Sequence, residues 1–266
     1  MTGPDRDPGR ANPLALIGYA NFLLLGWAGL LVPSLIRQVE HDLDQTDAGM
    51  AVFYLLFALL YATGNFAGGL LVERLGRRVV LSAAGFLMAG GLIGMAVSPD
   101  WAPFVVAGLP AGAGAGALDG GVNGLFLALF VRARNGVLNL LHLFFALGAL
   151  VAPLVIGQLV VAGTEWRPIV GLSGIGALGI GILLASQRMP SGRHRGGGEV
   201  ATRGAMLPAR RSIVPFVALG AAIAFYVAAE IGVSNWLVRF LADSPLSVAT
   251  LALSLFLGGL MVGRLV

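Results

Sequence analysis

The chain has 266 residues, of which 57% are hydrophobic and only 11% are charged. A soluble domain carries roughly a quarter charged residues, so this composition excludes an ordinary soluble protein. The absence of cysteine excludes disulfide scaffolds and thiolate metal sites. The net charge is +4, but the basic residues fall between apolar runs rather than along one face. Nucleic acid is therefore not an expected partner.

Eight stretches of the chain are long and apolar enough to form membrane helices, which need about 20 apolar residues each. The first follows a short charged N-terminus and is too long for a signal-peptide core, so we expect it to stay in the mature protein. Helices are expected because lipid cannot satisfy open backbone groups. The sequence thus predicts an all-α membrane protein. The predicted spans are 13–36, 48–72, 79–98, 102–131, 136–162, 168–187, 213–241 and 246–266.

The distribution of arginine predicts how these spans are oriented. All 17 basic residues are arginine, which indicates a GC-rich and therefore bacterial genome. If the spans alternate in direction, all but Arg37, Arg167 and Arg239 fall on one side. Loops rich in arginine stay in the cytoplasm. We therefore expect a multi-pass protein of the bacterial cytoplasmic (inner) membrane with its N-terminus in the cytoplasm.

The second predicted span ends in the segment GGLLVERLGRR, from Gly68 to Arg78. Its glycines allow helices to approach closely, and its charged turn anchors the cytoplasmic end. The segment resembles the signature of the major facilitator superfamily between the second and third helices, with glutamate where the family usually has aspartate. The resemblance implies a conformational latch on the cytoplasmic face. The residues at the signature positions are Gly69, Glu73, Arg74, Gly76, Arg77 and Arg78.

The fourth predicted span places a carboxylate, Asp119, beside a ridge of glycines. The glycines recur at every fourth position and predict close packing with another helix. Asp119 and Asn123 are four residues apart and so share a face. A charge at mid-membrane costs roughly 2.5–3.5 kcal/mol, so Asp119 should face a cavity or a partner, or be protonated. It serves either proton coupling and substrate binding, or a structural contact between helices. The ridge consists of Gly108, Gly112, Gly116, Gly120 and Gly124.

Two further spans carry polar residues with the same pair of interpretations. His142 on the fifth span is either a proton relay or a polar contact between helices. Glu230 lies in the middle of the seventh span, with Tyr226 and Ser234 one turn to either side. Asn235 and Trp236 follow them. A carboxylate, hydroxyls, an amide and a nearby ring form the combination that commonly holds sugar-like ligands, whereas a structural pair is the alternative.

The eighth predicted span ends in GGLMVGRLV, which repeats the GGLLVERL segment in the same direction and indicates a parallel repeat. We expect a six-helix unit at 1–187, a basic cytoplasmic linker at 188–212 and the first two helices of a second unit at 213–266. The superfamily usually has twelve helices. The resemblance therefore implies a chain truncated after the eighth helix.

The segments LNLLHLFFALGALVAPLVIG and FYVAAEIGVSNWLVRFL resemble the fucose:proton symporter type branch of the superfamily. This implies secondary active transport by alternating access, with proton-coupled uptake of a sugar or similar small polar solute. Asp119 and Glu230 are the expected coupling or binding residues. A drug or metabolite exporter and a non-transporting membrane fragment remain alternatives. We expect a monomer in the lipid bilayer, with no enzymatic activity, cofactor or metal.

Overall fold

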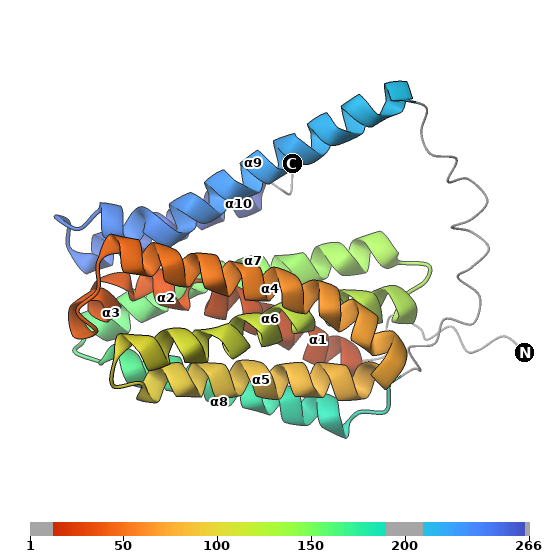
Figure 1. The fold of residues 1–266 in the computed structure, drawn as a ribbon, viewed down its shortest axis with the longest axis horizontal. Coiled ribbons are helices and arrows are strands. Elements are labelled where there is room, and N and C mark those ends of the chain that lie inside the picture. The colour runs from red at the N-terminus through yellow and green to blue at the C-terminus, as the bar shows by residue number, and fades with distance from the viewer. Residues whose placement is uncertain (1–12, 190–209, 264–266) are drawn as a thin grey trace, which may run out of the picture.

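The structure is a computed structural model that describes residues 13–189 and 210–263. Within these ranges every regular element is a helix, which confirms the all-α fold (Figure 1). Most of the predicted linker and the last residues of the second signature lie outside the described residues. The helices are α1 (Pro13–Gly29), α2 (Leu31–Ser34), α3 (Ile36–Asp42), α4 (Asp47–Leu75), α5 (Arg77–Val97), α6 (Trp101–Leu129), α7 (Arg134–Val161), α8 (Trp166–Ser186), α9 (Arg210–Phe240) and α10 (Leu246–Gly263).

Seven of these helices, α4 to α10, are long and apolar enough to cross a membrane. This agrees with the second to eighth predicted spans. The first predicted span, 13–36, is wrong as a single helix because the chain breaks at Leu30 and Leu35 into α1, α2 and α3. Pro33 explains the first break, since proline lacks an N–H and its ring clashes with the carbonyl four residues earlier. Leu30 accordingly leaves helical geometry, with φ −100° and ψ 2°.

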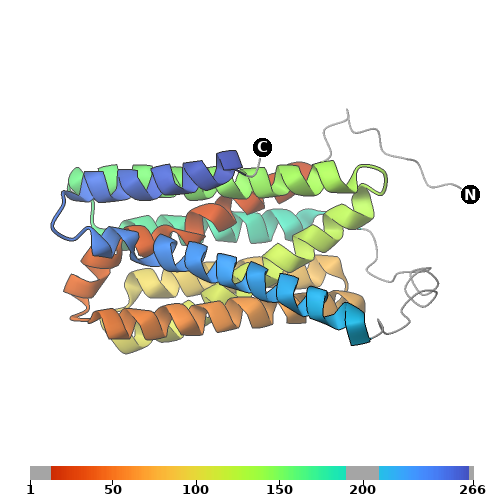
Figure 2. The same cartoon turned by 90° about the horizontal axis from the view of Figure 1, so that it is seen from above.

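Successive long helices run in opposite directions, so their connections gather at two ends of the bundle (Figures 1 and 2). One end, here called the arginine-rich end, holds the α4–α5 turn, the α6–α7 connection and the end of α8. It contains Arg74, Arg77, Arg78, Arg132, Arg134 and Arg188. The other, here called the acidic end, holds α3 and the starts of α4, α6, α8 and α10. It contains Glu40, Asp42, Asp44, Asp47, Asp100, Glu165 and Asp243.

Small residues let the helices of the bundle approach closely. Helix α5 packs against α8 and α6, α4 against α6, and α1 against α7 and α8. At the α5–α8 contact, a Cβ added to Gly85 would lie 2.6 Å from the Cα of Gly181. The α1–α7 contact is similar, because a Cβ on Gly148 would meet the Leu23 carbonyl. Such contacts hold membrane helices together through backbone packing, because lipid supplies no hydrophobic driving force between them.

Helix α9 stands apart from this bundle along most of its length. It contacts α2 and α3 at the acidic end and α10 beside it. Figure 1 shows α9 diverging from α4 towards the arginine-rich end. Residues 214–229 are exposed, whereas Ser234 and Val238 near the acidic end are buried. Helix α10 packs against α7, where the Ser254 hydroxyl donates to the Leu150 carbonyl at 2.9 Å.

Candidate functional site

The glycine ridge of α6 packs against α4, which confirms the predicted close approach for four of its five members. The facing residues on α4 also recur at every fourth position, so the two helices match over three turns. A Cβ added to Gly112 would lie 2.8 Å from the Phe57 carbonyl oxygen, while nothing lies within 4 Å of the Cβ position of Gly124. The matched pairs are Gly108 with Phe53, Gly112 with Phe57, Gly116 with Tyr61, and Gly120 with Asn65.

This packing brings two hydrogen-bond donors from α4 to the carboxylate of Asp119, and Asn123 on α6 supplies a third. The Tyr61 hydroxyl and the Asn65 amide donate to Oδ2 at 2.8 and 3.0 Å. The Asn123 amide donates to Oδ1 at 3.0 Å, as the shared face of Asp119 and Asn123 predicts. An ionised carboxylate only accepts hydrogen bonds, so this ring of donors suits the charged form. The predicted polar pair on α6 is therefore part of a four-residue cluster across two helices, here called the Asp119 cluster.

The sequence analysis missed the two residues that α4 contributes to the Asp119 cluster. Tyr61 and Asn65 are four residues apart in the largely apolar middle of α4. That spacing places them on one face, which is the same signal that singled out Asp119 and Asn123. The signal was therefore present on both helices.

His142 on α7 approaches the Asp119 cluster from a third helix. It lies near enough to Asp119 for its charged form to interact electrostatically with the carboxylate. The ring of Phe22 on α1 meets the imidazole edge-on, with 5.7 Å between ring centroids and an interplanar angle of 80°. The side chain of His142 is otherwise exposed. A histidine on a face that the described helices leave open is thus within electrostatic reach of the carboxylate.

The polar residues predicted on α9 are not assembled with the Asp119 cluster, because α9 packs chiefly against α2, α3 and α10. The Ser234 hydroxyl donates to the backbone carbonyl of Glu230 at 2.7 Å, within the helix. Tyr226 is 48% exposed, and Asn235 is half-buried. Trp236 reaches α4, where its ring meets that of Tyr54 edge-on with 5.7 Å between ring centroids.

The residues of the predicted latch motif point in different directions. Gly76 alone links α4 to α5, with φ +84°, a backbone conformation that favours glycine. Arg78 turns towards α8, where its Nε donates to the Ala185 carbonyl at 2.6 Å. Arg74 is exposed in the last turn of α4. Gly69, Glu73 and Arg77 line a cavity between α4 and α6.

A charged cluster at the acidic end joins α9 to α3 and α4. This cluster was not predicted from the sequence. Arg239 Nε lies 2.9 Å from Glu40 Oε2 and 2.8 Å from Asp47 Oδ1. Burial raises the pKa of Glu40, although the nearby Arg239 opposes that shift. Arg37 donates to three backbone carbonyls around the end of α9, those of Val238, Leu241 and Ser244.

A second ion pair at the acidic end joins α3 to α8. Arg167 Nη1 lies 2.6 Å from Asp42 Oδ2, and Trp166 Nε1 donates to the same oxygen at 2.8 Å. The hydrogen bond from Trp166 and the charge of Arg167 together lower the pKa of Asp42. Arg37, Arg167 and Arg239, the three exceptions to the arginine distribution, are thus all engaged at this end. In the described part of the chain, no group of His, Asp and Glu side chains is arranged to hold a metal ion.

The family model of the Major Facilitator Superfamily matches residues 14–266, almost the whole chain. The chain belongs to the major facilitator superfamily. This superfamily chain is 27% identical over 140 residues to the uncharacterized MFS-type transporter YfkL of Bacillus subtilis (strain 168), and 26% identical over 136 residues to sodium-dependent glucose transporter 1A of Mus musculus. The aligned parts cover 52% and 51% of this chain. They span 35% and 32% of the two relatives, about a third of their length.

Solved structures share the fold of this superfamily chain. The proton:xylose symporter XylE bound to 6-bromo-6-deoxy-D-glucose matches with a TM-score of 0.59 and 16% identity, over 66% of this chain and 44% of XylE. A partially occluded inward-open structure of XylE from E. coli matches with a TM-score of 0.56 and 17% identity. That match covers 66% of this chain and 50% of XylE.

Proposed function

We propose that this protein is a secondary active transporter that works by alternating access and takes up a sugar or similar small polar solute together with protons. The Asp119 cluster is the observation that carries the proposal. A carboxylate in a membrane helix is costly and is retained chiefly where it serves a pathway or a proton relay. Here it has three neutral donors and a histidine within electrostatic reach. Such a group changes charge when it gains or loses a proton.

The two ends of the bundle support alternating access. Charged contacts at the acidic end close α9 against α3 and α4. Towards the arginine-rich end α9 diverges from α4 (Figure 1). A transporter closed on one side and open on the other presents its central residues to one compartment at a time. In our proposal, opening the acidic end requires the Arg239 contacts to break.

The proposal includes the organisation expected from the sequence. Residues 1–187 form a six-helix unit, 188–212 a basic linker, and 213–266 the first two helices of a second unit. The arginine-rich end faces the cytoplasm of a bacterium, and the acidic end faces outwards. The protein acts as a monomer in the inner membrane. Glu230, Tyr226, Asn235 and Trp236 on α9 contribute to the substrate site. Glu73, Arg74, Arg77 and Arg78 act in the conformational latch.

One observation favours a second candidate, an exporter of less polar solutes within the same superfamily. The Ser234 hydroxyl is bonded within its own helix and therefore does not reach into a central site. Much of α9 also presents large apolar residues, with Phe225 and Val217 exposed. A less polar solute would suit that surface.

Uptake into membrane vesicles tests the two candidates. The protein is expressed from its complete reading frame, and a panel of labelled sugars is supplied with and without an imposed pH gradient. The proposal expects one sugar to accumulate only when the gradient is present. If no sugar accumulates although the protein is in the membrane, uptake of a sugar is excluded. Efflux of apolar dyes from the same vesicles then tests the exporter.

A further inference from the structure

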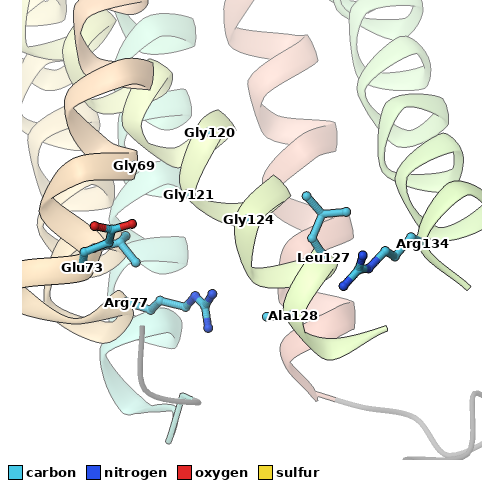
Figure 3. A pocket seen from close by; sticks show the side chains of 10 residues that line it. Gly69, Glu73, Arg77, Gly120, Gly121, Gly124, Leu127, Ala128 and Arg134 are labelled. Atoms are coloured by element: carbon cyan, nitrogen blue, oxygen red, sulfur yellow. The ribbon is translucent and has the colours of Figure 1, made fainter. Parts of the chain in front are cut away.

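A cavity of about 320 Å³ opens at the arginine-rich end beside the Asp119 cluster (Figure 3). Its volume lies at the lower end of the range for small-molecule sites. Glycines of α4 and α6 form much of its wall and leave the space free of side chains. Its charged lining consists of Glu73 on α4, Arg77 on α5 and Arg134 on α7. In Figure 3 the guanidinium groups of Arg77 and Arg134 both extend towards this space.

Arg77 is the unusual member of this lining. The residue as a whole is only 6% exposed, yet among the described residues its guanidinium makes no hydrogen bond or ion pair. Its neighbour Arg78, by contrast, is exposed and bonded to a carbonyl of α8. The donors of Arg77 are therefore open to the cavity, where an acceptor can bind them.

The backbone around the cavity favours a negative charge. Arg77 is the first residue of α5 and Arg134 the first of α7, and neither helix has a side-chain cap. Uncapped N–H groups and the positive end of the helix dipole attract anions. Two arginines and one glutamate leave one positive charge in excess. Glu73 opposes an anion, so the site is weaker than the arginines alone would make it.

We propose that this cavity binds a phosphate-bearing anion between Arg77 and Arg134. Phosphate oxygens accept paired hydrogen bonds from guanidinium groups, and a tetrahedral anion can bridge two of them. Such a ligand joins the start of α5 to the start of α7 and completes the pairing of Arg77. The phosphate comes either from free inorganic phosphate or from the headgroup of an anionic lipid. This site lies apart from the Asp119 carboxylate but shares Glu73 and Arg77 with the latch motif, and its binding is measured without transport activity.

Binding is tested on the purified full chain in neutral detergent. Inorganic phosphate is titrated while thermal unfolding is followed, with sodium chloride of equal ionic strength as reference. The expected result is a saturable rise in the unfolding temperature that chloride does not reproduce. Native mass spectrometry then counts phosphatidylglycerol retained from mixed vesicles of phosphatidylglycerol and phosphatidylcholine. If phosphatidylglycerol stays bound when phosphate is added, the lipid headgroup is the source of the phosphate group. If phosphate binds and the lipid is displaced or was never retained, free phosphate is the ligand.

Variants separate binding in the cavity from general charge effects. Arg77→Gln and Arg134→Gln should each weaken binding about tenfold or more, since each removes charge-assisted hydrogen bonds. The matched control is Arg188→Gln, which removes an exposed arginine at the same end. It should leave binding unchanged. Glu73→Gln should tighten binding, because it removes the opposing charge.

A further variant keeps the experiment decisive if Arg77→Gln does not fold. Leu127 also lines the cavity, and Leu127→Glu would supply a carboxylate to the two arginines while retaining both. It should abolish phosphate and lipid binding. The proposal is overturned if chloride stabilises as well as phosphate and no lipid is retained. It is equally overturned if binding persists unchanged in Leu127→Glu or weakens as much in Arg188→Gln.

Discussion

Arg239 at the end of α9 forms an ion pair with Glu40 on α3, with 2.9 Å between Nε and Oε2. The same nitrogen lies 2.8 Å from Asp47 Oδ1 at the start of α4. The Glu40 side chain is mostly buried, whereas Asp47 is exposed. Removing Arg239 would leave the mostly buried Glu40 carboxylate without its charged partner, which is destabilising. Arg239 therefore holds α9 against α3 and α4 at the acidic end.

Arg239→Gln should shift the protein towards a conformation open at the acidic end. We expect a change of about 1–2 kcal/mol, or roughly five- to thirtyfold in the ratio of closed to open states. Spin labels on Ala48→Cys and Ala242→Cys, both exposed, would report the distance between α4 and the end of α9. The chain has no cysteine of its own, so only these two sites are labelled.

The control for that experiment is Arg167→Gln. Arg167 pairs with Asp42 at the same end, but that contact joins α8 to α3 and does not involve α9. The distance between the labels should be unchanged in this variant. A distribution in Arg239→Gln that matches the unsubstituted protein would show that the ion pair does not hold the acidic end closed.

The closed state should also respond to pH through Glu40. Burial raises the pKa of Glu40 above its ordinary value of 4.5 in this closed arrangement. If exposure restores the ordinary pKa on opening, the closed state binds the proton more tightly. Its population should therefore rise as pH falls from neutral towards 4.5. The same pair of spin labels measures this, and Glu40→Gln should flatten the dependence. A closed population that falls over this range would contradict the assignment to Glu40.

Most of the fold could be predicted from the sequence alone because each membrane helix is recognisable from its own stretch of residues. Runs of apolar residues give each span without reference to the others. The glycine ridge predicted a close neighbour, although not that the neighbour is α4. The exception is the first span, where Pro33 ends α1 at a point that average hydrophobicity does not mark. Gly76 alone forms the turn between α4 and α5, with a positive φ that favours glycine. This explains why the signature has glycine at that position, which the resemblance to the family does not.

Partnerships between helices could not be predicted in the same way. The match of Gly116 to Tyr61 decides that Tyr61 and Asn65 meet Asp119, and this depends on the register of two helices. Arg239 likewise pairs with Glu40 across a distant part of the chain. Spacing within one helix shows which residues share a face, but only packing shows what that face meets.

The register of α4 and α6 can be tested at two glycines of the same ridge. Gly116→Ala would bring a methyl group onto the Tyr61 carbonyl, which is backbone and cannot turn away. We expect a loss of about 1–3 kcal/mol in stability, as for other overpacked sites. Gly124→Ala adds the same methyl group where nothing lies within 4 Å, and should change stability little. Thermal unfolding in detergent compares the two. Helix propensity favours alanine over glycine at both positions, so equal losses in the two variants would show that the contact with α4 does not set the effect.

Substitutions in the Asp119 cluster test the link between structure and coupling. Asp119→Asn removes the charge but keeps a side chain of similar size, so proton-driven accumulation should be abolished while exchange or binding of the solute remains. Tyr61→Phe keeps the carboxylate and removes one donor. Losing a hydrogen bond to a charged group costs about 1.5–3 kcal/mol, so the uptake rate should fall roughly tenfold or more without accumulation being lost.

The matched control for these variants is Asp44→Asn, an exposed acid at the acidic end. It should accumulate solute as the unsubstituted protein does. Uptake into vesicles with and without an imposed pH gradient measures all three variants, and exchange of labelled solute across vesicles without a gradient separates coupling from binding. Because Asp119 is the only one of the three whose charge lies inside the bundle, loss of accumulation in Asp119→Asn alone assigns the proton to this carboxylate. Unchanged accumulation in Asp119→Asn would remove it from the mechanism and leave the cluster as a structural contact between α4 and α6.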